Sequence, residues 1–233
     1  MDKYEIVRRI EEFAPSKTAE KWDCSGWLVE TKLKEVNKIM LALTVTKDVY
    51  NQAKRENCDM IISHHPLFEV PLEYKNIDIY CAHTNLDLAD GGTTDTLIDK
   101  LKILGLPIKK IIKDETFVRY VETDINFPEL GKILSKISPN LRYTDKGTVK
   151  FKKLALCAGS GSEFIEEAYL QGADCYITGD LKFHTALDSP IMVFDVGHFE
   201  TEIQILEVFK NLINNQAEVV YAKETSPFSI FVI

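Results

Sequence analysis

Two stretches of the chain repeat one another without a gap. Residues 38–87 align with residues 153–202 at a constant offset of 115, and eight of the fifty positions are identical. Chance would supply about three identities if roughly one position in twenty matches at random. Apolar strands, helical runs and two His-x-x-x-acid patterns also align in the same register. We therefore interpret the chain as an internal duplication of a β-α-β-β unit.

The repeat constrains the fold class, because strands that alternate with amphipathic helices are typical of α/β proteins. We expect two related α/β lobes, residues 1–107 and 108–213, and the C-terminal segment 214–233 is a candidate to complete the first lobe. In open α/β sheets, ligands collect beyond the carboxyl ends of the strands. The duplication therefore predicts a site in the cleft between the two lobes.

Hydrophobic periodicity and helix stop signals predict the individual elements. The expected helices are residues 2–14, 47–56, 93–104, 129–137, 162–171 and 199–213. The expected strands are residues 38–45, 59–63, 78–82, 117–123, 153–158, 174–178 and 191–196, and we expect the tail segments 218–222 and 229–233 to be extended.

The composition predicts a globular protein, and the apolar stretches are too short for a membrane span. The chain has 233 residues, 45% of them hydrophobic, so it can bury a sizeable core. Its N-terminus lacks the apolar centre of a signal peptide, and no apolar stretch approaches the roughly 18 residues of a membrane span. Five widely spaced cysteines without a C-x-x-C pattern favour free thiols in a reducing compartment. We expect a cytoplasmic protein.

The acidic balance argues against nucleic acid as a partner. The formal net charge is −8, whereas a nonspecific grip on nucleic acid depends on clustered Lys and Arg that displace counterions. The basic clusters at residues 109–113 and 150–153 are short, and we interpret them as solvated faces.

All five histidines of the chain follow short apolar runs. Imidazoles and carboxylates at strand ends are the usual material of a transition-metal site. The first lobe would supply His64, His65 and Asp87, and the second would supply His198 and Glu202. Five donors with two acids exceed what one tetrahedral zinc needs, so the residues predict two metal ions bridged by a carboxylate.

The two metal motifs also have purely structural interpretations. In an extended strand, adjacent His64 and His65 point to opposite sides, which on its own favours one core and one solvent-facing histidine. Pro66 indicates instead that the strand is already turning there. His198 and Glu202 are one helical turn apart and can chelate from one face, or Glu202 is a first-turn carboxylate favoured by the helix dipole. Both interpretations of this pair stay open.

Three further residues are candidates for catalysis: His83, Asp180 and His184. His83 precedes Asp87 by one helical turn and is a candidate to orient a neighbouring ligand or to act in acid–base chemistry. Asp180 and His184 form another pair at this spacing, for which we expect a proton-shuttle or substrate role; a loop-capping Asp and a surface His are the alternative. Residues 159–162 have the glycines of a phosphate cradle, but an N-cap in a tight turn is the favoured interpretation.

Five ordered motifs, which together span nearly the whole chain, resemble the Nif-three-like family. They are residues 22–29, 62–67, 83–92, 176–184 and 195–202. Members of this family are often called GTP cyclohydrolase I type 2 homologues. Many of them carry Asn where this chain has Cys24, which is a departure within the first motif.

The resemblance implies two α/β lobes that enclose a dinuclear metal site, in protomers that form a toroidal homohexamer. Carried over by position, the metal ligands fall on His64, His65, Asp87, His198 and Glu202, with Glu202 as the bridge. We expect two divalent ions per subunit, and this donor set suits Zn, Fe, Mn, Co or Ni about equally.

A bridged metal pair predicts hydrolytic chemistry, because it activates water and stabilises an oxyanion. The first hypothesis is a metal-dependent hydrolase of a nucleotide or another small phosphorylated heterocycle, with a GTP cyclohydrolase-like reaction by resemblance. The second is a ring-shaped binding or regulatory protein with structural metals, associated with nucleic acid or a protein partner. The acidic composition weakens its nucleic-acid version.

Overall fold

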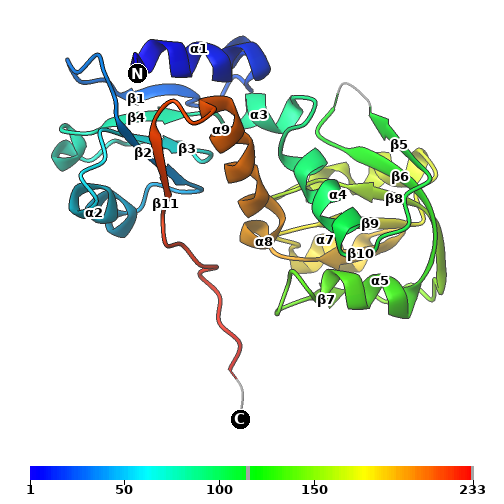
Figure 1. The fold of residues 1–233 in the computed structure, drawn as a ribbon. Helices are drawn as coiled ribbons and strands as arrows, with labels where there is room; N and C mark the ends of the chain where they lie inside the picture. The colour runs from blue at the N-terminus through cyan, green and yellow to red at the C-terminus, as the bar shows by residue number, and fades with distance from the viewer. Residues whose placement is uncertain (114–115, 232–233) are drawn as a thin grey trace. The chain divides into compact units, whose positions relative to one another are not determined.

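The computed structural model describes residues 1–113 and 116–231, and the chain divides into two compact units. Unit 1 comprises residues 1–92 and 205–225, and unit 2 comprises residues 93–204 and 226–233, of which the last two lie outside the described residues (Figure 1). Each unit contains a β-sheet with helices, which confirms the predicted α/β class. The lobe boundaries at residues 107 and 213 stay predictions.

Unit 1 is built on a five-stranded sheet with the order β1-β4-β3-β2-β11. Its strands are β1 (Gly26–Val29), β2 (Lys38–Ala42), β3 (Met60–Ser63), β4 (Asp78–Cys81) and β11 (Glu218–Tyr221). Its helices are α1 (Lys3–Phe13), α2 (Lys47–Arg55), α3 (Thr84–Leu88) and α9 (Leu206–Ile213), with short 3-10 helices η1 (Ser16–Thr18) and η2 (Leu72–Tyr74). All strand pairs except β1–β4 are parallel, so the carboxyl ends of β2, β3 and β4 lie at one edge.

Helix α1 shows how local signals and a long-range ion pair fix an element of unit 1. The Asp2 carboxylate caps the helix by accepting from the Tyr4 amide at 2.8 Å. Lys3 is fully buried, and its Nζ lies 3.1 Å from the equally buried carboxylate of Asp78 on β4. This pair ties α1 to the sheet.

Unit 2 is built on a six-stranded sheet with the order β5-β6-β8-β9-β10-β7. Its strands are β5 (Lys110–Lys113), β6 (Arg119–Asn126), β7 (Arg142–Tyr143), β8 (Lys150–Leu156), β9 (Cys175–Thr178) and β10 (Met192–Asp195). Its helical segments are α4 (Thr93–Ile103), α5 (Phe127–Leu134), η3 (Ser162–Phe164), α6 (Ile165–Leu170), α7 (Phe183–Asp188), α8 (His198–Glu202) and η4 (Ile203–Ile205), which runs on to α9. Strands β8, β9 and β10 are parallel, and β9, β10 and the end of β8 are buried on both faces.

Several element boundaries differ from the sequence-based expectations for physical reasons. The strand expected to run to residue 45 ends at Ala42, because the Leu43 and Thr44 amides donate to the carboxylate of Glu224. Helix α5 begins at residue 127 rather than 129, because Asn126 forms a capping box with Glu129. The helix expected over 199–213 is three consecutive pieces, α8, η4 and α9. The expectations missed β1, β5, β7, α3 and α7, all of which are short.

The two β-α-β segments have equivalent strand register at the offset of 115. The pair Leu41–Ile62 between β2 and β3 corresponds to Leu156–Ile177 between β8 and β9. These matches support the duplication, which itself stays a prediction. Among the described residues, no helix is both long and apolar enough to cross a bilayer.

Candidate metal centre

Three histidine rings of unit 1 lie together at the carboxyl edge of its sheet. His64 and His65 follow β3, and His83 follows the adjacent parallel strand β4. Each offers one ring nitrogen, and the three nitrogens lie within 4.8 Å of one another. The sheet topology therefore gathers donors that are 18 residues apart in the sequence.

The adjacent histidines both reach this cluster because the backbone has left the strand. The Ser63 hydroxyl donates to the His65 carbonyl at 3.1 Å, which curls the chain after β3. The ring centroids of His64 and His65 are only 5.0 Å apart, although His64 is fully buried and His65 is partly exposed. The extended-strand interpretation, with the rings on opposite sides, is therefore wrong.

The Nδ1 atoms of these two histidines are held by fixed partners. His64 Nδ1 lies 3.1 Å from the Ala82 carbonyl, which can only accept, so this nitrogen carries the proton. His65 Nδ1 forms a hydrogen bond of 2.7 Å with the Thr44 hydroxyl. Metal-binding imidazoles are oriented in this way, and a metal would bind both rings through Nε2.

Asp23 holds the third ring, His83, and was missed as a functional residue by reasoning from the histidines. Its buried carboxylate lies 3.0 Å from His83 Nδ1 and also accepts from Ser25, Thr84 and the Cys24 amide. Burial alone would raise the pKa of Asp23, but the hydrogen bonds from Thr84, His83 and Ser25 lower it to about 2. Residue 24 contributes a backbone amide here, so the Cys24 side chain is not needed for this contact.

Asp87 supplies a carboxylate beside the histidines of unit 1. It lies on α3, whose start places it one turn after His83, and its Oδ1 is 3.4 Å from His64 Nε2. The Asn85 side chain fixes this turn, because its oxygen accepts from the His83 amide at 3.0 Å and its nitrogen donates to the Ala14 carbonyl at 2.6 Å. Unit 1 therefore combines three imidazoles with one carboxylate.

Unit 2 has a second donor group on the first turn of α8. His198 Nε2 lies 2.9 Å from Glu202 Oε2, and His198 Nδ1 lies 2.7 Å from Asp180 Oδ2. Burial opposes the charged imidazole, but the hydrogen bond and charge of Glu202, followed by those of Asp180, raise the pKa of His198 to about 9. The two carboxylates that flank this imidazole concentrate negative charge, which a bound divalent cation would balance.

Asp180 and His184, which were predicted to act as a pair, contact different residues. Asp180 follows β9 with a positive φ of 54°, and its carboxylate contacts His198. His184 is exposed on α7, with its ring 5.2 Å from the ring of Phe183. None of the metal-donor groups found among residues 1–113 and 116–231 includes His184. Their catalytic roles stay predictions.

Gly159 has a role that neither interpretation of residues 159–162 foresaw. It has φ of +67°, and a Cβ there would collide with Glu202 Oε1. Its amide donates to Thr201 at 2.9 Å and the Gly161 amide donates to Thr178 at 3.0 Å, so both serve the fold rather than a phosphate. The N-cap of η3 is Gly161, which lies in this segment as expected but caps without a side-chain hydrogen bond. The loop instead leaves room for the Glu202 carboxylate beside Gly159.

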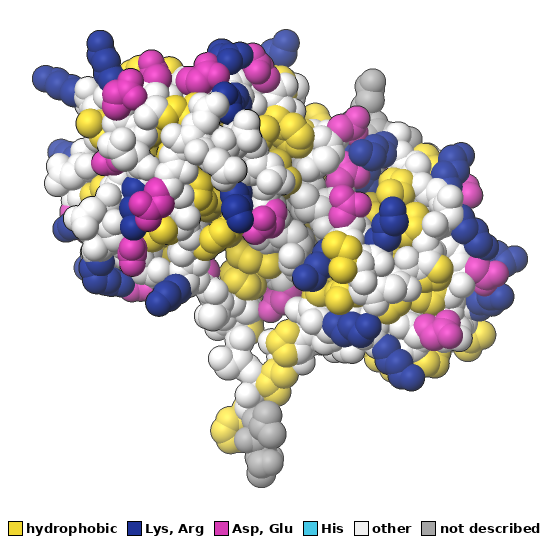
Figure 2. Space-filling model, viewed as in Figure 1, with side chains coloured by type: hydrophobic (Ala, Val, Ile, Leu, Met, Phe, Trp, Pro, Cys, Tyr) yellow, Lys and Arg dark blue, Asp and Glu magenta, His cyan; other side chains and the backbone are white. Residues whose placement is uncertain are grey.

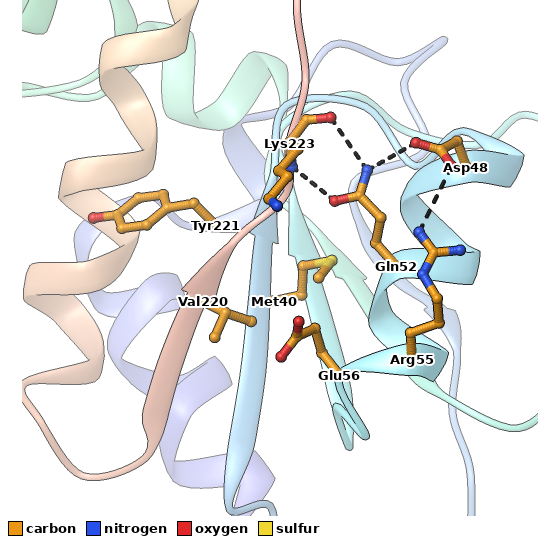
Figure 3. Close-up of a pocket in the computed structure, with 8 residues that line it drawn as sticks. All are labelled: Met40, Asp48, Gln52, Arg55, Glu56, Val220, Tyr221 and Lys223. Carbon is orange, nitrogen blue, oxygen red and sulfur yellow. Dashed lines mark hydrogen bonds and ion pairs between the residues drawn. The ribbon is translucent and has the colours of Figure 1, made fainter.

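A separate pocket of about 430 Å³ in unit 1 lies between α2 and β11 (Figure 3). It is lined by Met40, Asp48, Gln52, Arg55, Glu56, Val220, Tyr221 and Lys223. Gln52 bonds Asp48 at 2.8 Å and the Lys223 backbone at 2.8 and 3.1 Å, so it holds β11 to α2. This pocket contains none of the predicted site residues.

Comparisons with known proteins find relatives that match most of the chain. The chain is 36% identical over 227 residues to a protein of Clostridium acetobutylicum named GTP cyclohydrolase 1 type 2 homolog, covering 85% of this chain and 84% of that protein. It is 29% identical to the NGG1-interacting factor 3 of Saccharomyces cerevisiae, covering 92% and 91%.

Solved structures share the fold. Reduced HcgD from Methanocaldococcus jannaschii matches with a TM-score of 0.81 at 27% identity, covering 96% of this chain and 98% of that one. A Bacillus cereus protein related to NIF3 matches with a TM-score of 0.82 at 20% identity over 100% and 99%. The family model Duf34/NIF3 (NGG1p interacting factor 3) matches residues 1–227. The resemblance seen in the five motifs is thus confirmed, and the chain belongs to the Duf34/NIF3 family.

Proposed function

We propose that this protein is a metal-dependent hydrolase in which the donor groups of the two units serve one dinuclear centre. The proposed ligands are His64, His65 and Asp87 from unit 1 and His198 and Glu202 from unit 2. One observation carries the proposal: each of the three histidines bonds a fixed partner through Nδ1, and each would therefore bind a metal through Nε2. Imidazole and carboxylate donors of this kind suit Zn, Fe, Mn, Co or Ni.

Two divalent ions at these residues would supply Lewis-acid chemistry, activating water near neutral pH and stabilising developing negative charge. The residues around them hold the donors in place. Asp180 keeps His198 in one tautomer, and Gly159 leaves room for the Glu202 carboxylate. We therefore regard Asp180 as a positioning residue rather than a proton shuttle.

His83 is the residue best placed to move a proton. Its Nδ1 bonds the carboxylate of Asp23, which orients the ring and leaves Nε2 as the atom that accepts a proton. This base with its orienting carboxylate lies within the histidine cluster of unit 1. His184 remains a weaker candidate because it is exposed on α7.

For the substrate we propose a nucleotide or another phosphorylated heterocycle. The support is the name GTP cyclohydrolase 1 type 2 homolog carried by several relatives, which is an argument from analogy. We also propose a cytoplasmic homo-oligomer, a hexamer by family resemblance.

The test is turnover of a nucleotide panel by the purified protein loaded with Mn, Fe or Zn, compared with Glu202→Gln. The variant keeps the shape of the side chain but removes its charge, so we expect turnover to fall by a factor of about 100 or more, with the oligomeric state unchanged by light scattering. Tyr169→Ala, on the exposed face of α6 in unit 2, is the control. A parent protein that is fully metal-loaded and turns over no substrate of the panel would remove the hydrolase proposal.

That negative outcome would favour the second candidate, a binding or regulatory protein with structural metals. The observation that favours it is the yeast relative named NGG1-interacting factor 3, whose name records an interaction with a protein. Nucleic acid remains disfavoured: on the face drawn in Figure 2, Lys and Arg side chains are interspersed with Asp and Glu.

A further inference from the structure

Two large aromatic side chains are exposed beside the histidine cluster of unit 1. Trp22 is 59% exposed and Phe68 is 65% exposed. Their ring centroids are 6.5 Å apart with an interplanar angle of 31°, and the Trp22 ring meets the His83 ring edge-on at 5.9 Å. Aromatic rings left in solvent next to a polar donor cluster point to a ligand that covers them.

The backbone that presents Trp22 is held in place. The next residue, Asp23, has a buried carboxylate that bonds His83 and Thr84, and the Glu20 amide donates to the Thr84 hydroxyl at 2.9 Å. Trp22 is therefore displayed from an anchored segment rather than from a loose loop.

Phe68 is also displayed from a segment that is anchored on both sides. Leu67 packs against the core of unit 1, and Tyr74 of η2 is buried and stacks on Tyr50 with centroids 4.1 Å apart. Tryptophan and phenylalanine have only two side-chain torsions, so little conformational entropy is lost when such a pair covers a ligand. Both rings are thus held by anchored backbone, and a ligand can stack on them with little loss of conformational entropy.

We propose that Trp22 and Phe68 form an aromatic platform that stacks the planar heterocycle of a nucleobase-like substrate. Aromatic side chains stack on any base, because every base has a π-face. The edge-on contact between Trp22 and His83 joins the platform to the donor cluster, so a ring stacked there would lie beside the residues proposed to move protons and hold metal. The inference rests on the proposed function and names the part of the substrate that this surface recognises.

Fluorescence provides a binding assay that does not depend on turnover. The chain has two tryptophans, and Trp27 packs away from the platform, edge-on against Tyr80 with centroids 5.3 Å apart. Trp27→Phe therefore leaves Trp22 as the single reporter. In this background, at full metal loading with Mn or Zn, we expect guanosine to quench Trp22 fluorescence saturably and ribose to leave it unchanged.

Substitutions of Trp22 and Phe68 then test whether these two side chains bind guanosine. Phe68→Ala in the Trp27→Phe background should weaken guanosine binding roughly 5- to 150-fold, the range that corresponds to losing one stacked ring. Trp22→Ala, followed by calorimetry in the otherwise unchanged chain, should weaken it similarly. Tyr169→Ala removes an exposed aromatic ring of α6 and should leave binding unchanged.

The platform would be overturned if Phe68→Ala bound guanosine as well as its parent, if ribose bound as tightly as guanosine, or if guanosine gave no saturable quenching. Quenching that depends only on protein concentration would indicate that a second copy of the protein covers Trp22. This result would also overturn the platform. Base binding without turnover keeps the platform and removes the hydrolase. Turnover unaffected by Trp22→Ala and Phe68→Ala keeps the hydrolase and removes the platform.

Discussion

Unit 1 and unit 2 share a backbone frame but end their strands with different chemistry. In unit 1 the Asp59 carboxylate accepts from two successive amides, those of Asn37 and Lys38, at 2.7 and 3.2 Å. In unit 2 Asp174, at the offset of 115, accepts from the two amides at the same offset, at 2.6 and 2.9 Å. The hydrogen bonds that start the two β-α-β segments are therefore equivalent.

The equivalence stops where the central strands end. His64 and His65 follow β3, whereas Gly179 and Asp180 follow β9 at the same offset. A Cβ at Gly179 would come within 2.6 Å of the His198 amide, so unit 2 uses a glycine where unit 1 has a ligand candidate, because the start of α8 passes close to the backbone.

His83 and His198 occupy equivalent positions, and in both an aspartate bonds Nδ1. The two aspartates are not equivalent, because Asp23 comes from the segment before β1 and Asp180 from the end of β9. The strand and helix order therefore follows the repeat. The carboxylate that orients each imidazole through Nδ1 does not, because it comes from a different segment in each unit.

The largest expected difference between the units concerns a buried charge. Asp78 on β4 pairs with Lys3, and the position at the same offset in unit 2 is the buried, apolar Val193. Asp78→Asn should destabilise the protein by about 3–5 kcal/mol, because it leaves a buried ammonium without its counter-charge. The measurement is denaturant unfolding. The double variant Lys3→Met with Asp78→Val should recover most of the loss, and a single-variant loss below about 1 kcal/mol would contradict the account.

The second expected difference is a pH dependence that belongs to Asp23 of unit 1. The pKa of Asp23 is lowered from 3.8 to about 2, so its stabilisation is fully present above pH 4 and is lost as the pH falls through 2. Between pH 5 and pH 2 the parent should therefore lose about 2 kcal/mol more of its unfolding free energy than Asp23→Asn loses. Equal losses in both proteins would place the acid sensitivity elsewhere.

The smallest effect tests the shared frame directly. Asp59→Asn and Asp174→Asn each weaken two backbone hydrogen bonds at a partly exposed carboxylate, so each should cost about 1–2 kcal/mol. Equivalence predicts that the two costs agree within about 0.5 kcal/mol. Urea unfolding of each variant gives the values, and a cost confined to one unit would break the comparison.

The sequence predicted the longer strands, the helices between them and the histidines that lie together at the edge of the unit 1 sheet. It missed Asp23, Thr44 and Ala82 as the partners of ring nitrogens, because those contacts join segments 18 to 60 residues apart. The end of β2 depends on Glu224, 180 residues away from Thr44, which no local pattern can reveal. Asp23 did lie in a motif of the resemblance, and that motif was the one available signal.

Metal content tests the central claim most directly. Protein loaded with Zn or Mn and then desalted should carry two ions per chain by elemental analysis, and His198→Ala and Glu202→Gln should each lower this number while Tyr169→Ala does not. A folded parent chain that retains no divalent ion after loading, or variants that retain as much as the parent, would contradict the claim that these residues hold the metals.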